Sequence, residues 1–294
     1  MAIVITGNSL ASYVNLQNNK IYNDISKSVR RLSTGLRINN AADDPAGFAV
    51  SELMRADLST LNQGERNLND AISLVQTASE ALLNINTQLI KMKELAEQAS
   101  TATYTDEQRL LMQSEFSSLG AEIDRISNET NYNNIKLLDG SLQATKNRQT
   151  NSGWTEANEG LLVHFGTKSD RNSDYYFISL PKSDSNEIFS NSIPSIDSQT
   201  SAQSALTSID SAMIKTTNFQ SYLGGIQNRL ESSLDSTSTK KINMQSSYET
   251  ITDIDIANEM SLYISSLVRN EISLAMMAQA NILQQQALKL MVFN

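Results

Sequence analysis

The C-terminal segment carries the most constraining pattern in the sequence. Apolar side chains recur there at steps of three or four residues: Met260, Ile264, Val268, Ile272, Met276, Ala280, Leu283, Ala287 and Leu290. Such spacing places them along one side of an α-helix, so we predict a helix of about 35 residues that runs almost to the C-terminus. Its apolar stripe needs a partner, because an isolated helix gains little stability from propensity alone.

A second stripe of the same character lies at the opposite end of the chain, at Leu10, Val14, Ile21, Ile25, Val29 and Leu32. We expect the two end helices, within residues 1–43 and 255–294, to pair antiparallel and to present their remaining faces to identical chains. Head-to-tail contacts that do not close a ring build a helical filament. The competing interpretation is that both stripes pack onto one globular core, and their position at the two extreme ends argues against it.

Between the two ends the sequence predicts a helical rod that comprises residues 44–180 and 202–254. A helix begins near Pro45, because the preceding Asp43 and Asp44 suit an N-cap and proline suits the first helical turn. Its apolar residues repeat at an average close to the 3.5 residues of a coiled-coil seam. They are Leu68, Ile72, Val75, Ala78, Leu82, Ile85, Leu89 and Met92.

The rest of the rod follows from shorter patterns. Thr105 suits the N-cap of a second, antiparallel helix, and helical spacing returns over residues 206–234. Two runs rich in β-formers predict a β-hairpin over about residues 161–180. Residues 181–201 hold two prolines and many serines, which predicts a short variable surface loop. The expected fold is therefore mainly α, with a coiled-coil-like rod, a terminal helix pair and a small β-hairpin.

Composition supports this architecture and excludes several partners. The chain of 294 residues holds 11 glycines and 3 prolines, so long uninterrupted elements are expected. A net charge of −9 without a basic block argues against nucleic acid and against an anionic membrane surface. The absence of cysteine excludes disulfides and thiolate metal sites. The N-terminus lacks the basic start of a Sec signal peptide, and we expect no transmembrane span.

Catalytic chemistry finds no support in the sequence. His164 is the single histidine and lies in an apolar run, where a structural role is expected. No phosphate-binding loop, dinucleotide fingerprint, zinc-protease motif or nucleophile elbow occurs. We expect no enzyme, no cofactor and no metal site. Asp43 and Asp44 are expected to cap a helix, and Asp253 and Asp255 are expected to start the last one.

Specific motifs resemble those of bacterial flagellins. The run from Arg31 to Gly47, RLSTGLRINNAADDPAG, is similar to the N-terminal hallmark of that family. Further similar segments stand in the family's order at residues 93–96, 122–126, 133–138, 223–229, 253–255 and 277–281. The resemblance covers about residues 1–140 and 205–294. Few residues separate the hairpin from the returning helix, so the chain resembles a short flagellin without a large outer domain.

The resemblance implies a structural subunit that self-assembles into the flagellar filament for swimming motility. It also implies secretion through the flagellar type III export channel, a chaperone at the C-terminal helix, and contacts with flagellar junction and cap proteins. The residues expected to carry self-assembly are Leu10, Val14, Ile21, Ile25, Arg31, Leu32, Arg37, Met260, Ile264, Val268, Ile272, Met276, Leu283 and Leu290. Arg31 and Arg37 are expected to contact acidic groups of neighbouring chains.

The family's innate immune receptor site matches Lys91, Leu95 and Glu115 in this sequence. Lys91 stands where the family usually has arginine, and lysine lacks the planar fork that binds a partner through two hydrogen bonds. Two alternatives to a filament subunit remain. The hook–filament junction protein shares the terminal architecture, and a soluble coiled-coil adaptor would also have long seams and little glycine.

Overall fold

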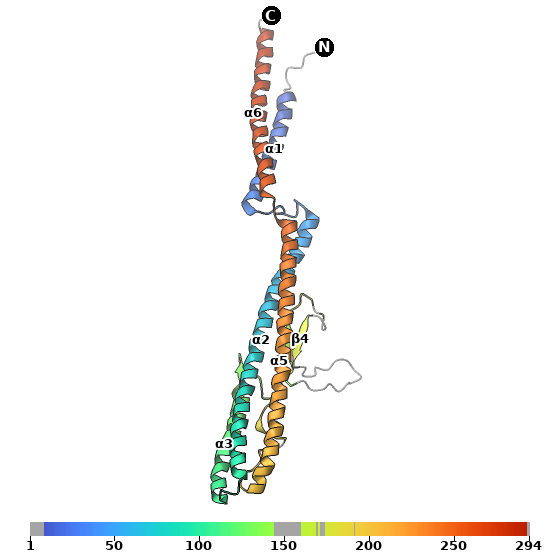
Figure 1. Cartoon of the computed structure of the whole chain (residues 1–294). Helices are drawn as coiled ribbons and strands as arrows, with labels where there is room; N and C mark the ends of the chain where they lie inside the picture. Colours follow the sequence, from blue (N-terminus) through green and yellow to red (C-terminus); the bar gives the residue numbers. More distant parts are fainter. Residues whose placement is uncertain (1–8, 144–159, 169, 171–173, 191, 293–294) are drawn as a thin grey trace, which may run out of the picture. The chain divides into compact units, whose positions relative to one another are not determined.

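The computed structural model of the chain describes residues 9–143, 160–168, 170, 174–190 and 192–292, with side chains except at positions 9, 10, 284 and 287–292. The helices of this described part are α1 (Ser9–Thr34), α2 (Pro45–Ser100), α3 (Asp106–Glu129), α4 (Ser185–Ile188), α5 (Gln199–Thr252) and α6 (Ile256–Val292) (Figure 1). Its strands are β1 (Asn131–Tyr132), β2 (Ile135–Lys136), β3 (Leu161–His164) and β4 (Tyr175–Ile178). The prediction of a mainly helical fold with long helices and a small hairpin is confirmed.

The chain divides into two compact units. The terminal unit comprises residues 1–56 and 243–294, and the rod unit comprises residues 57–242. The boundaries fall within α2 and α5, because each of these helices continues without a break from one unit into the other. The sequence analysis placed the boundaries of the terminal pair nearer the two chain ends, at residues 43 and 255. That assignment of residues to a terminal pair and a rod stays a prediction.

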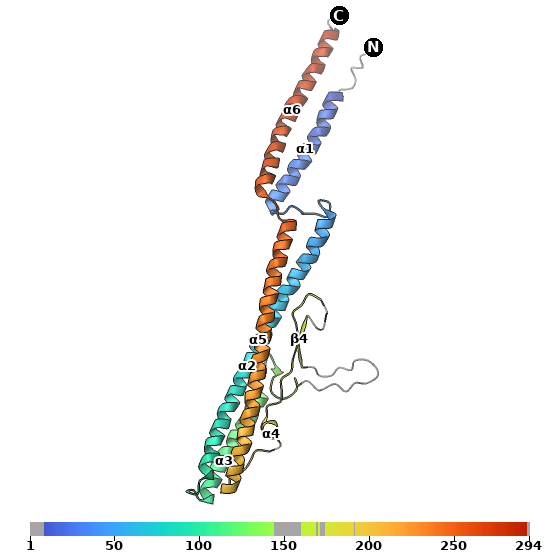
Figure 2. The ribbon, with the colours of Figure 1, turned by 45° about the vertical axis from the view of Figure 1, so that its right-hand side comes forward.

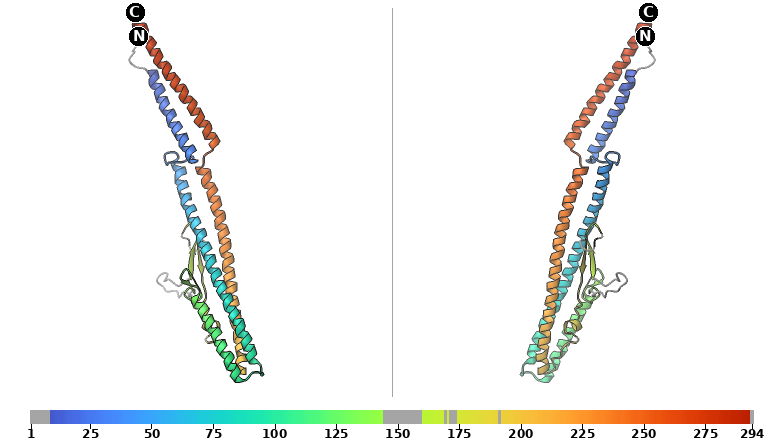
Figure 3. Two further views of the ribbon diagram at one scale, coloured as in Figure 1. Left: turned by 90° about the vertical axis from the view of Figure 1, so that its left-hand side faces the viewer. Right: turned by 90° about the vertical axis from the view of Figure 1, so that its right-hand side faces the viewer.

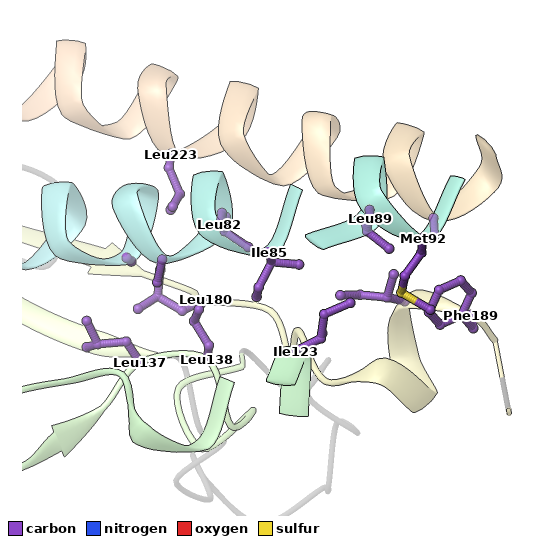
Figure 4. Packing of buried hydrophobic residues seen from close by; sticks show 14 of the residues in the cluster. Leu82, Ile85, Leu89, Met92, Ile123, Leu137, Leu138, Leu180, Phe189 and Leu223 are labelled. Carbon is purple, nitrogen blue, oxygen red and sulfur yellow. The ribbon is translucent and has the colours of Figure 1, made fainter. Parts of the chain in front are cut away.

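The core of the rod unit lies between α2, α3 and α5. The predicted α2 seam is buried except at Ile72, which is partly buried, and Figure 4 shows several of its buried members close to Ile123 of α3. From α5 come Ala202, Ala205, Ile209, Ala212, Leu223, Ile226 and Leu230. Many of these residues are small, so the core is a narrow seam between helices.

The junction of α2 and α3 is held by polar groups. Thr105 caps α3 as predicted: its side chain accepts a hydrogen bond from the Gln108 amide, and the Gln108 side chain accepts one from the Thr105 amide. The buried Arg109 donates to the carbonyls of Ala99 at 2.8 Å and Thr101 at 2.8 Å. The last carbonyls of α2 therefore gain partners inside the fold. The sequence analysis did not identify this role of Arg109.

The predicted hairpin is formed by β3 and β4, which pair antiparallel from Leu161 opposite Ile178 to His164 opposite Tyr175. It packs against α2 at Gly64, where a Cβ atom would lie 2.3 Å from the carbonyl oxygen of Phe165. Only glycine allows the hairpin to approach the helix so closely. The Nε2 atom of His164 lies 2.9 Å from the Lys168 carbonyl oxygen, and the structural role expected for this histidine stays a prediction.

Two features of the rod unit differ from expectation. A second hairpin, β1–β2, was not predicted, and its two-residue turn at Asn133 and Asn134 has φ angles of 49° and 65°. Asparagine tolerates this left-handed backbone, so the turn closes without glycine. Residues 181–201 were expected to be a surface loop, and this is wrong for part of the segment. Ile188 and Ile196 are buried in the core, because apolar residues among the serines fold back onto the helices.

Candidate functional site

In the terminal unit, α1 and α6 lie side by side and run antiparallel (Figures 2 and 3). α1 turns Val14, Asn18 and Ser28 into the contact as buried residues. The most buried side chains of α6 in this contact are Glu259, Ser273 and Ala280. Partly buried residues of α1 in the contact are Ile21, Ile25 and Leu32, and those of α6 are Tyr263, Ser266, Leu267, Asn270 and Met277. We call this contact the α1–α6 seam; on the α6 side it is mostly polar or small.

A buried carboxylate fixes the end of the seam where α1 ends and α6 begins. Glu259 is 6% exposed and accepts a hydrogen bond from the Ser28 hydroxyl at 2.6 Å. Its other oxygen lies 3.4 Å from the guanidinium of Arg31, which is itself mostly covered. A buried charge needs such partners, because an unpaired one costs several kcal/mol. Arg31 therefore has an acidic partner within its own chain, while its contact with a neighbouring chain stays a prediction.

The hallmark run of residues 31–47 comprises the end of α1, the connector at residues 35–44 and the start of α2. Gly35 adopts a φ of 72°, which favours glycine, and its carbonyl accepts the Ile254 amide at 3.1 Å. The Arg37 amide donates to the Thr252 carbonyl at 2.7 Å, and its guanidinium donates to the Ile251 carbonyl at 2.9 Å. Backbone hydrogen bonds thus join residues 35–37, which follow α1, to residues 252–254, which precede α6.

The paired aspartates of the connector take different roles. Asp44 accepts the Gly47 amide at 3.0 Å and caps α2, as predicted. Asp43 does not cap the helix, which corrects the prediction for this residue, because its carboxylate turns back to accept the amides of Asn39 and Asn40, each at 3.3 Å. Burial raises the pKa of the Asp43 carboxyl, but the Asn39 amide, Lys27 and the Asn40 amide together lower it below 3.8. Lys27 lies 3.3 Å away.

Apart from Ala280, which is buried in the seam, the predicted apolar stripe of α6 does not face α1 over the residues whose side chains are described. Its members Met260, Ile264, Val268, Ile272, Met276 and Leu283 are between 41% and 58% exposed. Further large apolar side chains of α6 are exposed at Ile256, Leu262, Leu274 and Ile282, and α1 exposes Tyr13, Leu16, Tyr22 and Val29. We call this set of α6 and α1 residues the exposed apolar face. The side chains of the remaining predicted positions, Leu10 and Leu290, lie outside the described part.

The stripe predicted for α1 behaves differently from that of α6. Val14 is buried and Ile21, Ile25 and Leu32 are half-buried, so these residues supply the apolar side of the seam, whereas Val29 of the same stripe is exposed. Both stripes lie on helices, as their spacing predicted. It did not show which stripe would be covered within the chain, and it missed the exposed Tyr13, Leu16 and Tyr22.

The other predicted positions lie in the rod unit. Lys91 is exposed and Leu95 is half-buried on α2, one helical turn apart, and Glu115 is exposed on α3. Among the described residues, no group of three or more acidic or histidine side chains is arranged to hold a metal ion. Within the same part of the chain, every helix is too short or too polar to cross a membrane.

The comparisons with known proteins decide the family. The family model for the bacterial flagellin N-terminal helical region matches residues 5–143, and the model for the bacterial flagellin C-terminal helical region matches residues 206–291. A flagellin of Halalkalibacterium halodurans is 37% identical over 90% of this chain and 91% of its own length.

The chain belongs to the bacterial flagellin family.

Two other relatives match this chain over similar shares of both sequences. A flagellin of Bacillus subtilis is 34% identical over 90% of this chain and 92% of its own, and the flagellar filament 31.3 kDa core protein of Treponema maltophilum is 32% identical over 90% and 91%. A putative flagellar hook-associated protein of Vibrio parahaemolyticus has the same fold, with a TM-score of 0.53, 17% identity, and 72% of this chain and 100% of that one covered. The family is one of structural proteins, and the connector hallmark lies inside the matched N-terminal region.

Proposed function

We propose that this flagellin is the structural subunit of a bacterial flagellar filament used for swimming, and that it polymerises through the exposed apolar face of α1 and α6. The observation that carries the proposal is the exposure of the α6 stripe. Burying a large apolar side chain completely contributes about 1.5–3 kcal/mol, so the six half-exposed stripe residues offer roughly 5–10 kcal/mol. A soluble chain rarely leaves such a face uncovered unless a partner occupies it.

Several neighbours, rather than one, suit the distribution of these residues. On α6, exposed large apolar side chains lie on more than one side of the helix, at Met260, Leu262 and Ile264 within little more than one turn. A helix that is apolar on most sides belongs in the interior of a larger packed structure. Copies of the same chain around an axis would provide that interior, and the relatives are named flagellins and filament core proteins.

The two alternatives have less support. The full-length relatives are flagellins and filament core proteins, whereas the hook-associated neighbour shares the fold at 17% identity. A soluble coiled-coil adaptor would gain nothing from an exposed apolar stripe on a terminal helix. An adaptor also leaves the hallmark connector without a reason, while a filament subunit needs its terminal pair held in a fixed local geometry.

The partners that a filament subunit requires form part of the proposal. The subunit would be secreted through the flagellar type III export channel, with a chaperone covering the apolar face of α6 beforehand. In the filament it would also meet junction and cap proteins. Lys91, Leu95 and Glu115 would contact an innate immune receptor, more weakly than a chain with arginine at position 91, because lysine makes a single-point contact.

Seeded polymerisation tests the function. Purified full-length chain and a shortened chain lacking residues 1–40 and 255–294 are mixed with sheared filament fragments, and growth is followed by light scattering and negative-stain microscopy. Filaments from the full-length chain alone support the proposal. Soluble particles from both chains, or filaments from both, contradict the assignment of polymerisation to the terminal helices.

A further inference from the structure

α6 presents to α1 a side on which most residues are polar or small. The seam side carries Glu259, Tyr263, Ser266, Asn270, Ser273, Met277 and Ala280, at steps of three and four residues, and Leu267 is partly buried beside them. The stripe Met260, Ile264, Val268, Ile272 and Met276 lies on the other side and is exposed. Hydrophobic burial alone would favour the opposite arrangement, with α6 turned about its axis so that the stripe packs against Ile21 and Ile25. Some specific interaction must therefore select the polar side.

Two buried asparagines lie within the seam. Asn18 is 7% exposed on α1, and Asn270 is partly buried on α6. The Oδ1 atom of each is buried and has no hydrogen-bond partner among the described residues. An unsatisfied buried carboxamide is costly, so each oxygen requires a donor. Rotating one carboxamide by half a turn exchanges its acceptor oxygen and its donor nitrogen, so that one asparagine can donate to the oxygen of the other.

The helix geometry places the two asparagines opposite each other. The Ser28–Glu259 hydrogen bond fixes one level of the antiparallel pair. Asn18 lies ten residues before Ser28, and Asn270 lies eleven residues after Glu259. At about 1.5 Å per residue, both asparagines are about 16 Å from that level, in the same direction along the pair. The two carboxamides thus share one layer of the seam.

We propose that the carboxamides of Asn18 and Asn270 hydrogen-bond across the seam and, together with the Ser28–Arg31–Glu259 contacts, fix which side of α6 meets α1. A single polar pair in a helical seam specifies alignment because every other alignment leaves both groups buried without partners. Turning the apolar stripe inward would pull Asn270 out of the layer and leave Asn18 unpaired beside aliphatic side chains. The polar layers therefore keep the stripe free for neighbouring copies, a consequence that rests on the proposed function, whereas the pairing itself does not.

Introduced thiols measure the orientation of α6, because the chain has no cysteine of its own. Ile21→Cys with Ser266→Cys reports the observed orientation, since the two positions share a seam layer. Ile21→Cys with Val268→Cys reports an α6 helix turned by about half a revolution. The full chain is equilibrated in a glutathione redox buffer, and the effective concentration of each thiol pair is read from the fraction of intramolecular disulfide.

Each reporter is measured in the parent, Asn18→Leu, Asn270→Leu and the double variant. We expect each single substitution to lower the effective concentration of the Ser266 reporter about tenfold, because it leaves the other carboxamide unpaired. The double variant should recover most of that loss, because neither group remains. With the Val268 reporter, the effective concentration of the thiol pair should be several-fold higher in the double variant than in the parent. Asn19→Leu, at an exposed position of α1, is the matched control and should change neither reporter.

The proposal is overturned if the two single effects simply multiply in the double variant, because the side chains then do not interact. It is equally overturned if the effective concentration measured with the Val268 reporter is the same in the parent and the double variant. Polymerisation is scored separately by sedimentation of the reduced chains. A chain that never polymerises contradicts the proposed function, yet the thiol measurements still decide whether Asn18 and Asn270 pair.

Discussion

At the scale of single residues, a few buried or half-buried charges hold the turns where helices end. Arg109 supplies donors to carbonyls at the end of α2, and its third contact, with Asp106 at 2.6 Å, keeps the guanidinium in place. The Asp43 carboxylate accepts hydrogen bonds from two backbone amides of the connector, those of Asn39 and Asn40. Both residues stand in polar stretches where a surface position is the ordinary expectation, so the sequence alone did not predict their roles.

Replacing Arg109 tests the first of these turns. Arg109→Leu leaves the carbonyls of Ala99 and Thr101 without partners and should lower the free energy of unfolding by about 1–3 kcal/mol. Urea denaturation followed by far-ultraviolet circular dichroism measures the change. Arg125→Leu is the matched control, because Arg125 is exposed and pairs with Glu122 and Glu129 at the surface. It should leave the urea midpoint almost unchanged. Equal effects of the two variants would show that burial of Arg109 is unimportant.

The Asp43 carboxylate predicts a pH dependence. Its pKa is lowered in the folded chain, so its contribution to stability is present above the unfolded-state value near 3.8 and is lost as the pH falls through the lower, folded-state pKa. Asp43→Asn should lower the free energy of unfolding by about 1–3 kcal/mol at about pH 7, with a smaller difference at about pH 3. Asp235→Asn, at an exposed position of α5, should have no effect at either pH. A difference for Asp43→Asn that does not shrink in acid would contradict the account.

At the scale of elements, helices follow directly from the sequence and their packing partners do not. The apolar spacing of α2 and the Thr105 cap are local signals, and the structure confirms both. The spacing of α6 is equally regular, yet that stripe stays exposed while Asn270 and Ser273 turn toward α1. Periodicity shows that a helix has an apolar side, but which side is covered within one chain depends on residues far away in sequence.

The β3–β4 hairpin offers a test of packing at this scale. Gly64→Ala places a methyl group against the Phe165 carbonyl and should push the hairpin away from α2, at a cost of about 1–3 kcal/mol. Gly224→Ala on α5 meets nothing within 4 Å and should instead stabilise the helix by up to about 1 kcal/mol. Thermal unfolding and limited proteolysis of the hairpin compare the two variants. A Gly64→Ala chain as stable and as protease-resistant as the parent would rule out the close contact.

At the scale of the whole molecule, the proposed route of self-assembly rests on the terminal unit. The α1–α6 seam pairs the Glu259 carboxylate with Ser28 and Arg31 within the chain and leaves large apolar side chains outside. The sequence showed the two terminal stripes and their need for partners. It could not show that the α1 stripe is used within the chain and the α6 stripe is left over, because that outcome depends on pairing across more than 200 residues of sequence.

The most direct test of this account changes the α6 stripe in the otherwise intact chain. Ile264→Asp with Ile272→Asp places two charges on the exposed apolar face, while Ser246→Asp adds a charge at an exposed polar position of α5. Seeded polymerisation is followed by light scattering and checked by electron microscopy, with thermal unfolding as a control for folding. We predict that the double variant folds but adds no length to filament seeds, while Ser246→Asp grows as the parent does. Normal filament growth by the double variant would contradict the assignment of the exposed apolar face to self-assembly.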